Sequence, residues 1–189
     1  MFYYSAQIFT IAGFSSDSSM LQSVILGVTN LIFTLLAMAI IDKVGRKKLL
    51  LFGQLGMALV LGLFGYGLLS GNIKGIWLVA LLVSYIAFFA ASFGVVVWVL
   101  LSEMFPNIIR ARGASLGSFS NWGVSALLNF LFPVIIGVFG TTMAAQQKGM
   151  SFAFIFLALV TLVGFFYMKT HIIETKGKTL EQIEKEVLH

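Results

Sequence analysis

The sequence predicts an all-α membrane protein with five full transmembrane helices and a partial helix before them. Of its 189 residues, 59% are hydrophobic and only 10% are charged, whereas soluble domains average about 25% charged residues. Several apolar runs reach the roughly 20 residues that an α-helix needs to cross a bilayer core. These runs lack the period-two alternation of membrane barrel strands, so helices are the remaining way to satisfy backbone polar groups in lipid.

The opening run, residues 1–14, is typical of a partial helix, because about 13 apolar-leaning residues span roughly 20 Å, too short to cross a bilayer. Full helices are predicted over about 20–41, 49–70, 76–102, 113–140 and 150–170. Together they form one transmembrane bundle over 1–171. In the tail, 172–189, Thr179 and Gln182 fit a capping box and predict a short amphipathic helix at the membrane surface.

The cations are distributed unevenly between the two sides of the predicted bundle. Ten of the 12 Lys and Arg residues lie in the loops 42–48 and 104–112 and from residue 169 onward, while the alternate loops hold only Lys74 and Lys148. The positive-inside rule makes the cation-rich side cytoplasmic. We therefore expect a multi-pass protein of the cell (plasma or inner) membrane with a cytoplasmic C-terminus. The net charge of +5 reflects this loop bias and does not indicate nucleic acid as a partner.

The predicted spans contain neutral polar and aromatic side chains but no charged ones, apart from Lys169 at the end of the last span. Intramembrane acids are the usual marks of proton relays, whereas this chain has residues such as Asn30, Trp98, Asn121 and Trp122. Amides hydrogen-bond to hydroxyls, and indole rings pack on the apolar face of a sugar ring. A pathway lined in this way suits a neutral, hydroxyl-rich solute better than an ion.

An enzyme is not predicted. The stretch "GASLG", 113–117, fits the G-x-S-x-G pattern of serine hydrolases, but the two histidines, His171 and His189, both lie beyond the last predicted span. Ser115 therefore has no base within reach, and the small residues instead favour close helix packing. We expect no catalytic residue, no metal site and no cofactor.

Four stretches carry a resemblance to a known family. "IDKVGRKKLL", 41–50, resembles the D-R-x-G-R-R loop of the major facilitator superfamily. "SEMFPNIIRARG", 102–113, resembles the E-x-F-P-x-x-x-R-x-x-G signature of sugar porters. "ETKGKTLEQIE", 174–184, is similar to that branch's P-E-T-K-G tail, with Ile173 in place of proline, and "FYYSAQIF", 2–9, is similar to its seventh helix. The four stretches occur in the family's order, so the chain resembles a sugar porter over nearly its whole length.

The resemblance implies that this chain is the C-terminal six-helix bundle of a twelve-helix, proton-coupled monosaccharide transporter that works by alternating access. Its partners would be the sugar, a proton, the lipid bilayer and the missing N-terminal six-helix half. The proton-coupling site would lie outside this chain. One alternative stays open: a membrane sugar-binding or sensor subunit that does not transport, or an inactive fragment.

The resemblance also implies two sets of site residues. The expected substrate-binding residues are Tyr3, Asn30, Gly94, Trp98, Asn121 and Trp122. The expected cytoplasmic gate consists of Asp42, Gly45, Arg46, Glu103, Arg110, Arg112 and Glu174. Because Val95 replaces a proline that follows the glycine in many relatives, any kink in this helix would come from Gly94. The competing interpretations are helix packing for the first set and membrane orientation alone for the second.

Overall fold

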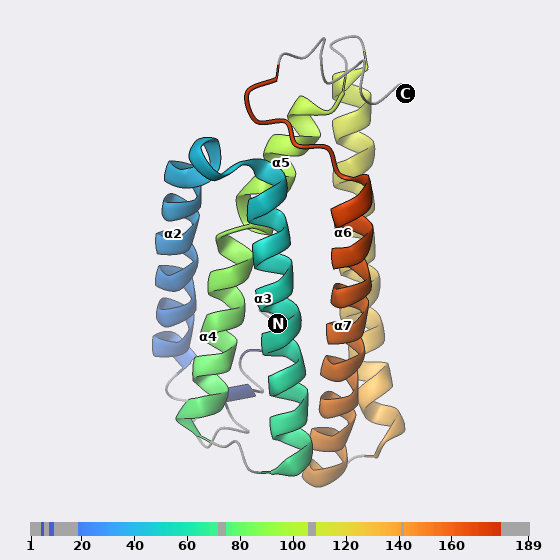
Figure 1. The fold of residues 1–189 in the computed structure, drawn as a ribbon. Helices are drawn as coiled ribbons and strands as arrows, with labels where there is room; N and C mark the ends of the chain where they lie inside the picture. Colours follow the sequence, from blue (N-terminus) through green and yellow to red (C-terminus); the bar gives the residue numbers. More distant parts are fainter. Residues whose placement is uncertain are drawn as a thin grey trace.

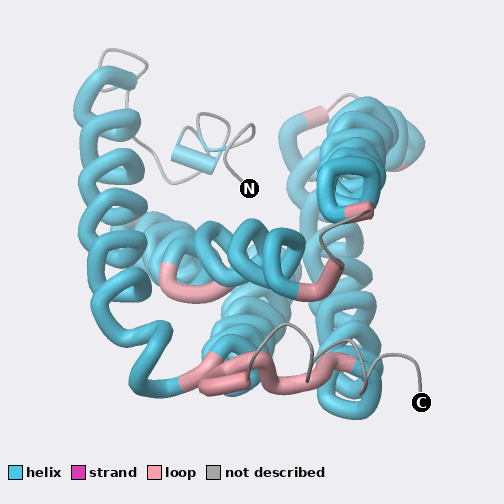
Figure 2. Tube along the Cα trace, turned by 90° about the horizontal axis from the view of Figure 1, so that it is seen from above, coloured by secondary structure: helices cyan, strands magenta, loops and turns pink. Residues whose placement is uncertain are grey.

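The computed structural model describes residues 5, 8, 9, 19–71, 75–105, 109–140 and 142–178. Six helices are defined along this part of the chain: α2 (Ser19–Val44), α3 (Arg46–Ser70), α4 (Ile76–Ala90), α5 (Phe93–Glu103), α6 (Arg110–Val138) and α7 (Met143–His171). Helices α4 and α5 run in the same direction as parts of one span, and the five spans run alternately up and down (Figure 1). Seen from above, the described residues form helices and short connecting loops, and no strand is present among them (Figure 2).

Five segments of the described residues are long and apolar enough to cross a membrane: Gln22–Val44, Arg46–Ser70, Ile76–Glu103, Arg110–Val138 and Ala144–His171. The predicted fold class is therefore confirmed. Of the predicted partial helix before them, the structure describes only Ser5, Ile8 and Phe9, all three helical. The predicted tail helix lies outside the described residues.

Helix α3 stands at the centre of the bundle and α6 at its edge. Thirteen residues of α3 are buried, whereas only Phe132 and Ile136 are buried in α6. The main core joins α3, α4 and α7, and Phe154 lies at its centre, 5.0 Å from Phe64 and 5.6 Å from Phe132 between ring centroids. Ile8 and Phe9 also belong to this core.

A second, smaller core lies near the end of the bundle where α2 ends and α3 begins. It consists of Ala37, Ile41, Leu49, Leu50, Val96 and Leu100. Ile172, just after α7, packs against it. This core fixes the ends of α2 and α5 against the start of α3, which positions the charged side chains at these ends.

The span 76–103 is interrupted between α4 and α5. Helix α4 ends at Ala90 and α5 begins at Phe93, and Ser92 between them has φ −133° and ψ −85°. The buried Ser92 hydroxyl donates to the Phe88 carbonyl at 2.6 Å. Gly94, the residue to which any kink was attributed, lies inside α5, two residues after Ser92. Gly53 of α3 leaves room for this break, because a Cβ there would lie 1.9 Å from Ser92 Oγ.

Candidate functional site

Arg46, the first residue of α3, links the ends of three helices. Its Nη1 lies 2.7 Å from Asp42 Oδ1 near the end of α2, and its Nη2 lies 2.9 Å from Glu103 Oε1 at the end of α5. The Arg46 side chain is 13% exposed, against 78% for Asp42 and 26% for Glu103. Exposed ion pairs contribute little to stability. The less exposed Glu103 is therefore the partner that does most to hold the Arg46 side chain in place.

The carboxylate of Glu174 lies at the N-terminus of α3. The Arg46 backbone N–H donates to Glu174 Oε1 at 2.9 Å, and the Lys47 N–H donates to Oε2 at 3.2 Å. Helix α3 has no acid in its first turn and no cap from the preceding side chain. Glu174 therefore supplies the hydrogen-bond acceptors and the negative charge that the start of a helix favours, although it is 128 residues away in sequence.

Gly45 is required where it stands. Its φ of 101° is one that side chains other than glycine rarely adopt, and a Cβ built there would lie 2.6 Å from Glu174 Oε2. The missing side chain therefore does two things: it allows the turn from α2 into α3, and it leaves room for the carboxylate.

Residues 172–178, here called the C-terminal strap, cross from the end of α7 to the ends of the other helices (Figure 1). The buried Thr175 donates its hydroxyl proton to Glu103 Oε2 at 2.7 Å. Lys176 Nζ donates to the backbone carbonyl of Lys43. Through Glu174, Thr175 and Lys176, the strap is thus hydrogen-bonded to the start of α3, the end of α5 and the end of α2. Sequence reasoning did not select Thr175, although it is the residue next to Glu174 in the quoted tail stretch.

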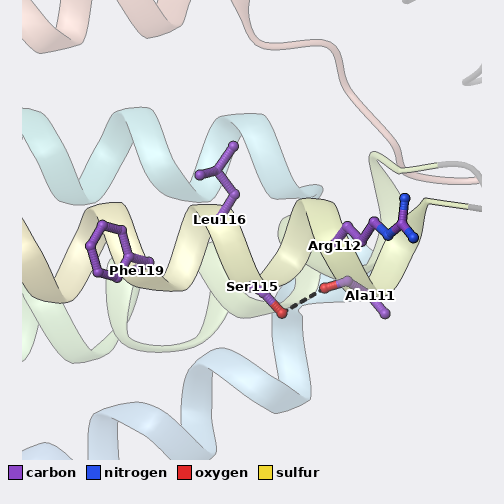
Figure 3. A pocket seen from close by; sticks show the side chains of 5 residues that line it. All are labelled: Ala111, Arg112, Ser115, Leu116 and Phe119. Atoms are coloured by element: carbon purple, nitrogen blue, oxygen red, sulfur yellow. Dashed lines mark hydrogen bonds between the residues drawn. The ribbon is translucent and has the colours of Figure 1, made fainter.

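Five of the seven expected gate residues come together in this network, and Arg110 and Arg112 do not. Arg110 Nε donates to the Phe105 carbonyl at 3.3 Å, and its buried Nη2 has no partner among the described residues. Arg112 is exposed and borders an open depression of about 490 Å³ on α6 (Figure 3). In the same depression the Ser115 hydroxyl donates to the Ala111 carbonyl at 2.7 Å (Figure 3), so the serine of the "GASLG" stretch has a backbone partner.

The expected substrate-binding residues lie on three helices. Asn30, on α2, is half-buried and accepts a hydrogen bond from the Thr34 hydroxyl at 3.1 Å. Gly94 and Trp98 are on α5, and Asn121 and Trp122 are on α6. Tyr3 lies outside the described residues. The substrate-binding role of these residues remains a prediction.

The indole rings and Asn121 are open to the surroundings of the bundle. Trp98 is 42% exposed and Trp122 is 59% exposed. Asn121 borders a second depression on α6, of about 470 Å³, with Ser120, Val124, Ser125 and Leu128. Among the described residues, no hydrogen bond or ring contact joins Asn30, Trp98 and Asn121. No group of three or more potential metal ligands occurs in the described ranges.

Comparison with known proteins places these features in a family. Residues 1–187 match the model of the family described as "Sugar (and other) transporter". The chain is 34% identical to the arabinose-proton symporter of Bacillus subtilis over 97% of its own length, and 38% identical to the D-xylose-proton symporter of Escherichia coli over 96%. It is 36% identical to the glucose facilitated diffusion protein of Zymomonas mobilis over 97%. The chain spans 36–38% of the length of these relatives.

Solved structures agree with the sequence comparison. A double-tryptophan mutant of XylE has a TM-score of 0.86 at 35% identity, covering 98% of this chain and 38% of that one. The inward-open xylose transporter XylE from E. coli has a TM-score of 0.71 at 30% identity, covering 96% and 40%. With the family match over nearly all its residues and the same fold, the chain belongs to the sugar (and other) transporter family.

Proposed function

We propose that this chain is the C-terminal half of a proton-coupled transporter that moves a monosaccharide across the cell membrane by alternating access. A first six-helix half, absent from this chain, would complete the solute cavity and carry the proton-coupling group. In such carriers the binding site lies near the bilayer midplane between two bundles that rock against each other. The chemistry proposed for this chain is binding and conformational change, without bond cleavage.

The observation that carries the proposal is the exposure of Trp98 and Asn121 on apolar membrane spans. An indole ring and a primary amide are poorly matched to lipid, because their polar atoms find no partner there. They match a sugar well, since an amide can donate to and accept from neighbouring hydroxyls while an indole packs against ring C–H groups. The described spans contain no acid between their ends that would favour a cation instead.

The charged end of the bundle is proposed to be the cytoplasmic gate. The pair Arg46–Glu103 and the cap from Glu174 hold three helix ends together, so a movement of α5 or of the strap relative to α3 has to break named bonds. Because states of a carrier differ by only a few kcal/mol, the loss of one such partly buried bond is enough to change their populations. Arg110 and Arg112 are proposed as outer members of this gate. The partners of Arg110 Nη2 would come from outside the described residues.

The binding site is tested with Trp98→Ala and Asn121→Ala in the complete carrier. Each variant should weaken equilibrium binding by about 1–3 kcal/mol, since it removes ring stacking or leaves a sugar hydroxyl unpaired. The sugars to be measured are D-xylose, L-arabinose and D-glucose, which the names of the relatives suggest. Trp77→Ala is the matched control, because Trp77 is 70% exposed at the start of α4, away from the proposed site. Unchanged affinity in both site variants would leave these residues a packing role only.

The gate is tested separately, with Arg46→Lys and Glu103→Gln. Arginine holds carboxylates through a planar fork that lysine lacks, whereas the positive-inside rule treats the two residues alike. Both variants should insert normally and bind sugar with unchanged affinity, yet show a reduced initial uptake rate. Wild-type uptake in both variants would reduce this network to a signal for membrane orientation.

A further inference from the structure

Threonine hydroxyls inside the apolar helices of this protein mostly donate to the backbone of their own helix. The hydroxyls of Thr29, Thr161 and Thr170 each donate to the carbonyl four residues earlier, at 2.7, 2.7 and 3.2 Å. The side-chain amide of Asn129 does the same, since its Nδ2 donates to the Ser125 carbonyl at 2.9 Å. Such a bond satisfies a polar group where lipid offers no partner. A polar side chain of these spans that bonds in another way needs its own explanation.

Thr34 and Asn30, both on α2, depart from this pattern. The Thr34 hydroxyl donates to the side-chain oxygen Oδ1 of Asn30 at 3.1 Å, and both residues are half-buried. Within the described part of the chain, no hydrogen bond involves the Nδ2 group of Asn30. Nor does Nδ2 belong to the enclosed polar atoms that lack a partner there. The two N–H donors of this amide are therefore open to a group that the described residues do not supply.

The bond from Thr34 determines which end of the Asn30 amide is presented. Oδ1 and Nδ2 belong to one planar group, and Thr34 lies one helical turn further along α2. With Oδ1 held by the Thr34 hydroxyl, the end of the amide that stays free is a donor. An amide without a partner is costly in lipid, so this donor requires an acceptor, such as an oxygen atom of a polar solute.

We propose that Thr34 is a positioning residue of the sugar site, which fixes Asn30 as a hydrogen-bond donor to one sugar oxygen. The inference rests on the proposed function and assigns the polarity of one contact. A sugar hydroxyl can donate or accept, so a fixed donor makes that hydroxyl the acceptor. A pre-oriented amide also loses less freedom on binding than one that turns freely. Thr34 thus acts on sugar affinity through Asn30, without touching the sugar.

Affinity in the complete carrier is the first test, measured with D-xylose, L-arabinose and D-glucose. Thr34→Val keeps the shape of the side chain but removes the hydroxyl, so it should weaken binding of the best-bound sugar by about 2- to 12-fold, the range for one neutral hydrogen bond. Thr34→Ser keeps the hydroxyl and should retain most of the affinity. Thr29→Val is the matched control, because the Thr29 hydroxyl donates to the Ile25 carbonyl. It should leave the affinity unchanged.

The polarity of the contact is the second test, and it uses the wild-type carrier. Monodeoxy and monodeoxyfluoro analogues of the best-bound sugar are compared, because a fluorine in place of a hydroxyl can accept a hydrogen bond but cannot donate one. The contacted hydroxyl is the one whose removal weakens binding to the wild type but not to Asn30→Ala. At this position the fluoro analogue should bind more tightly than the deoxy analogue. In Thr34→Val, where the amide can turn, that preference should shrink.

The outcomes separate this inference from the function on which it rests. Weaker binding in Asn30→Ala with wild-type affinity in Thr34→Val would overturn the role of Thr34 and leave the proposed function intact. Equal affinity for the fluoro and deoxy analogues at the contacted position would overturn the assignment of Asn30 as a donor. Wild-type affinity in Asn30→Ala would overturn the inference, while the tests at Trp98 and Asn121 would still decide the proposed function. If none of the three sugars binds, both proposals fail.

Discussion

Replacing Glu174 with glutamine tests whether the C-terminal strap holds α3 in place. Glutamine keeps the size of the side chain and one carbonyl acceptor, but it removes the negative charge and one of the two acceptors now used by Arg46 N–H and Lys47 N–H. A charge at a helix N-terminus contributes about 0.3–1 kcal/mol when exposed and up to about 2 kcal/mol when partly buried. Glu174 is half-buried, so we expect a loss of about 1–2 kcal/mol, which is a factor of about 5–30 in the ratio of docked to undocked strap.

Amide hydrogen exchange measures this ratio directly. The N–H groups of Arg46 and Lys47 lie in the first turn of α3, where a helix offers no carbonyl to accept them, and Glu174 is the acceptor that the structure gives them. Their exchange in the wild type therefore reports undocking of the strap. In Glu174→Gln the exchange of a peptide covering these two residues should accelerate by about 5–30-fold, while peptides from the middle of α3 keep their protection.

Asp42→Asn is the matched control. It also removes an acid that contacts Arg46, but its side chain is 78% exposed, and exposed pairs contribute about 0–1 kcal/mol. Its exchange at Arg46 and Lys47 should stay close to the wild type. If Glu174→Gln leaves exchange at these amides unchanged, or if Asp42→Asn accelerates it equally, Glu174 does not fasten the strap to α3 and the reasoning fails.

Three further predictions concern packing and orientation. Gly45→Ala should destabilise the folded protein in detergent by about 1–3 kcal/mol, the range for a residue held in a backbone region reserved for glycine. A melting temperature equal to that of the wild type would contradict the positive φ of Gly45 and its close contact with the Glu174 carboxylate. Gly65→Ala should destabilise the folded protein by about 1–3 kcal/mol of overpacking and so lower its melting temperature, because its new Cβ would lie 2.8 Å from a backbone oxygen of α7. Gly123→Ala, with nothing within 4 Å of its Cβ, should not lower it, and equal losses in the two variants would refute the close approach of α3 to α7. Single cysteines at Lys47 and Lys148 should react with an impermeant reagent from opposite sides of the membrane, and labelling of both from outside would overturn the proposed orientation.

The elements of the fold could be predicted because each is specified by its own residues. Long runs without charge define the spans, and the cation-rich loops mark their ends, so the fold class followed from composition and length alone. The observed ends differ by a few residues where charges were excluded from the predicted helices. Arg46, Lys47 and Lys48 belong to the first turn of α3, because a helix end can keep charged side chains in the polar zone while its backbone continues into the apolar one.

Details that depend on tertiary contacts could not be predicted in the same way. The break at Ser92 is accompanied by a bond from its hydroxyl to the Phe88 carbonyl, but Ser84 makes the same type of bond inside α4 without a break. A serine in the sequence therefore does not mark the position of a break. Arg112 carries the same charge as Arg46 and stands in an equally specific motif, yet it is exposed on α6 and is not part of the network around Arg46. A motif identifies residues that act in a common region, but it does not give the partner of each side chain.

The network at the charged end cannot be explained by charge alone. A loop that only set the orientation of the chain would need lysines and arginines in any arrangement, and neither a glycine at position 45 nor a buried threonine at position 175 would matter. Here Gly45 leaves the space that the Glu174 carboxylate occupies, and Thr175 uses the second oxygen of Glu103, whose first oxygen pairs with Arg46. Each member is shaped by another that is far away in sequence. Such mutual fitting favours one relative position of α3, α5 and the strap, and the proposed gate would need this network to break as a unit when it opens.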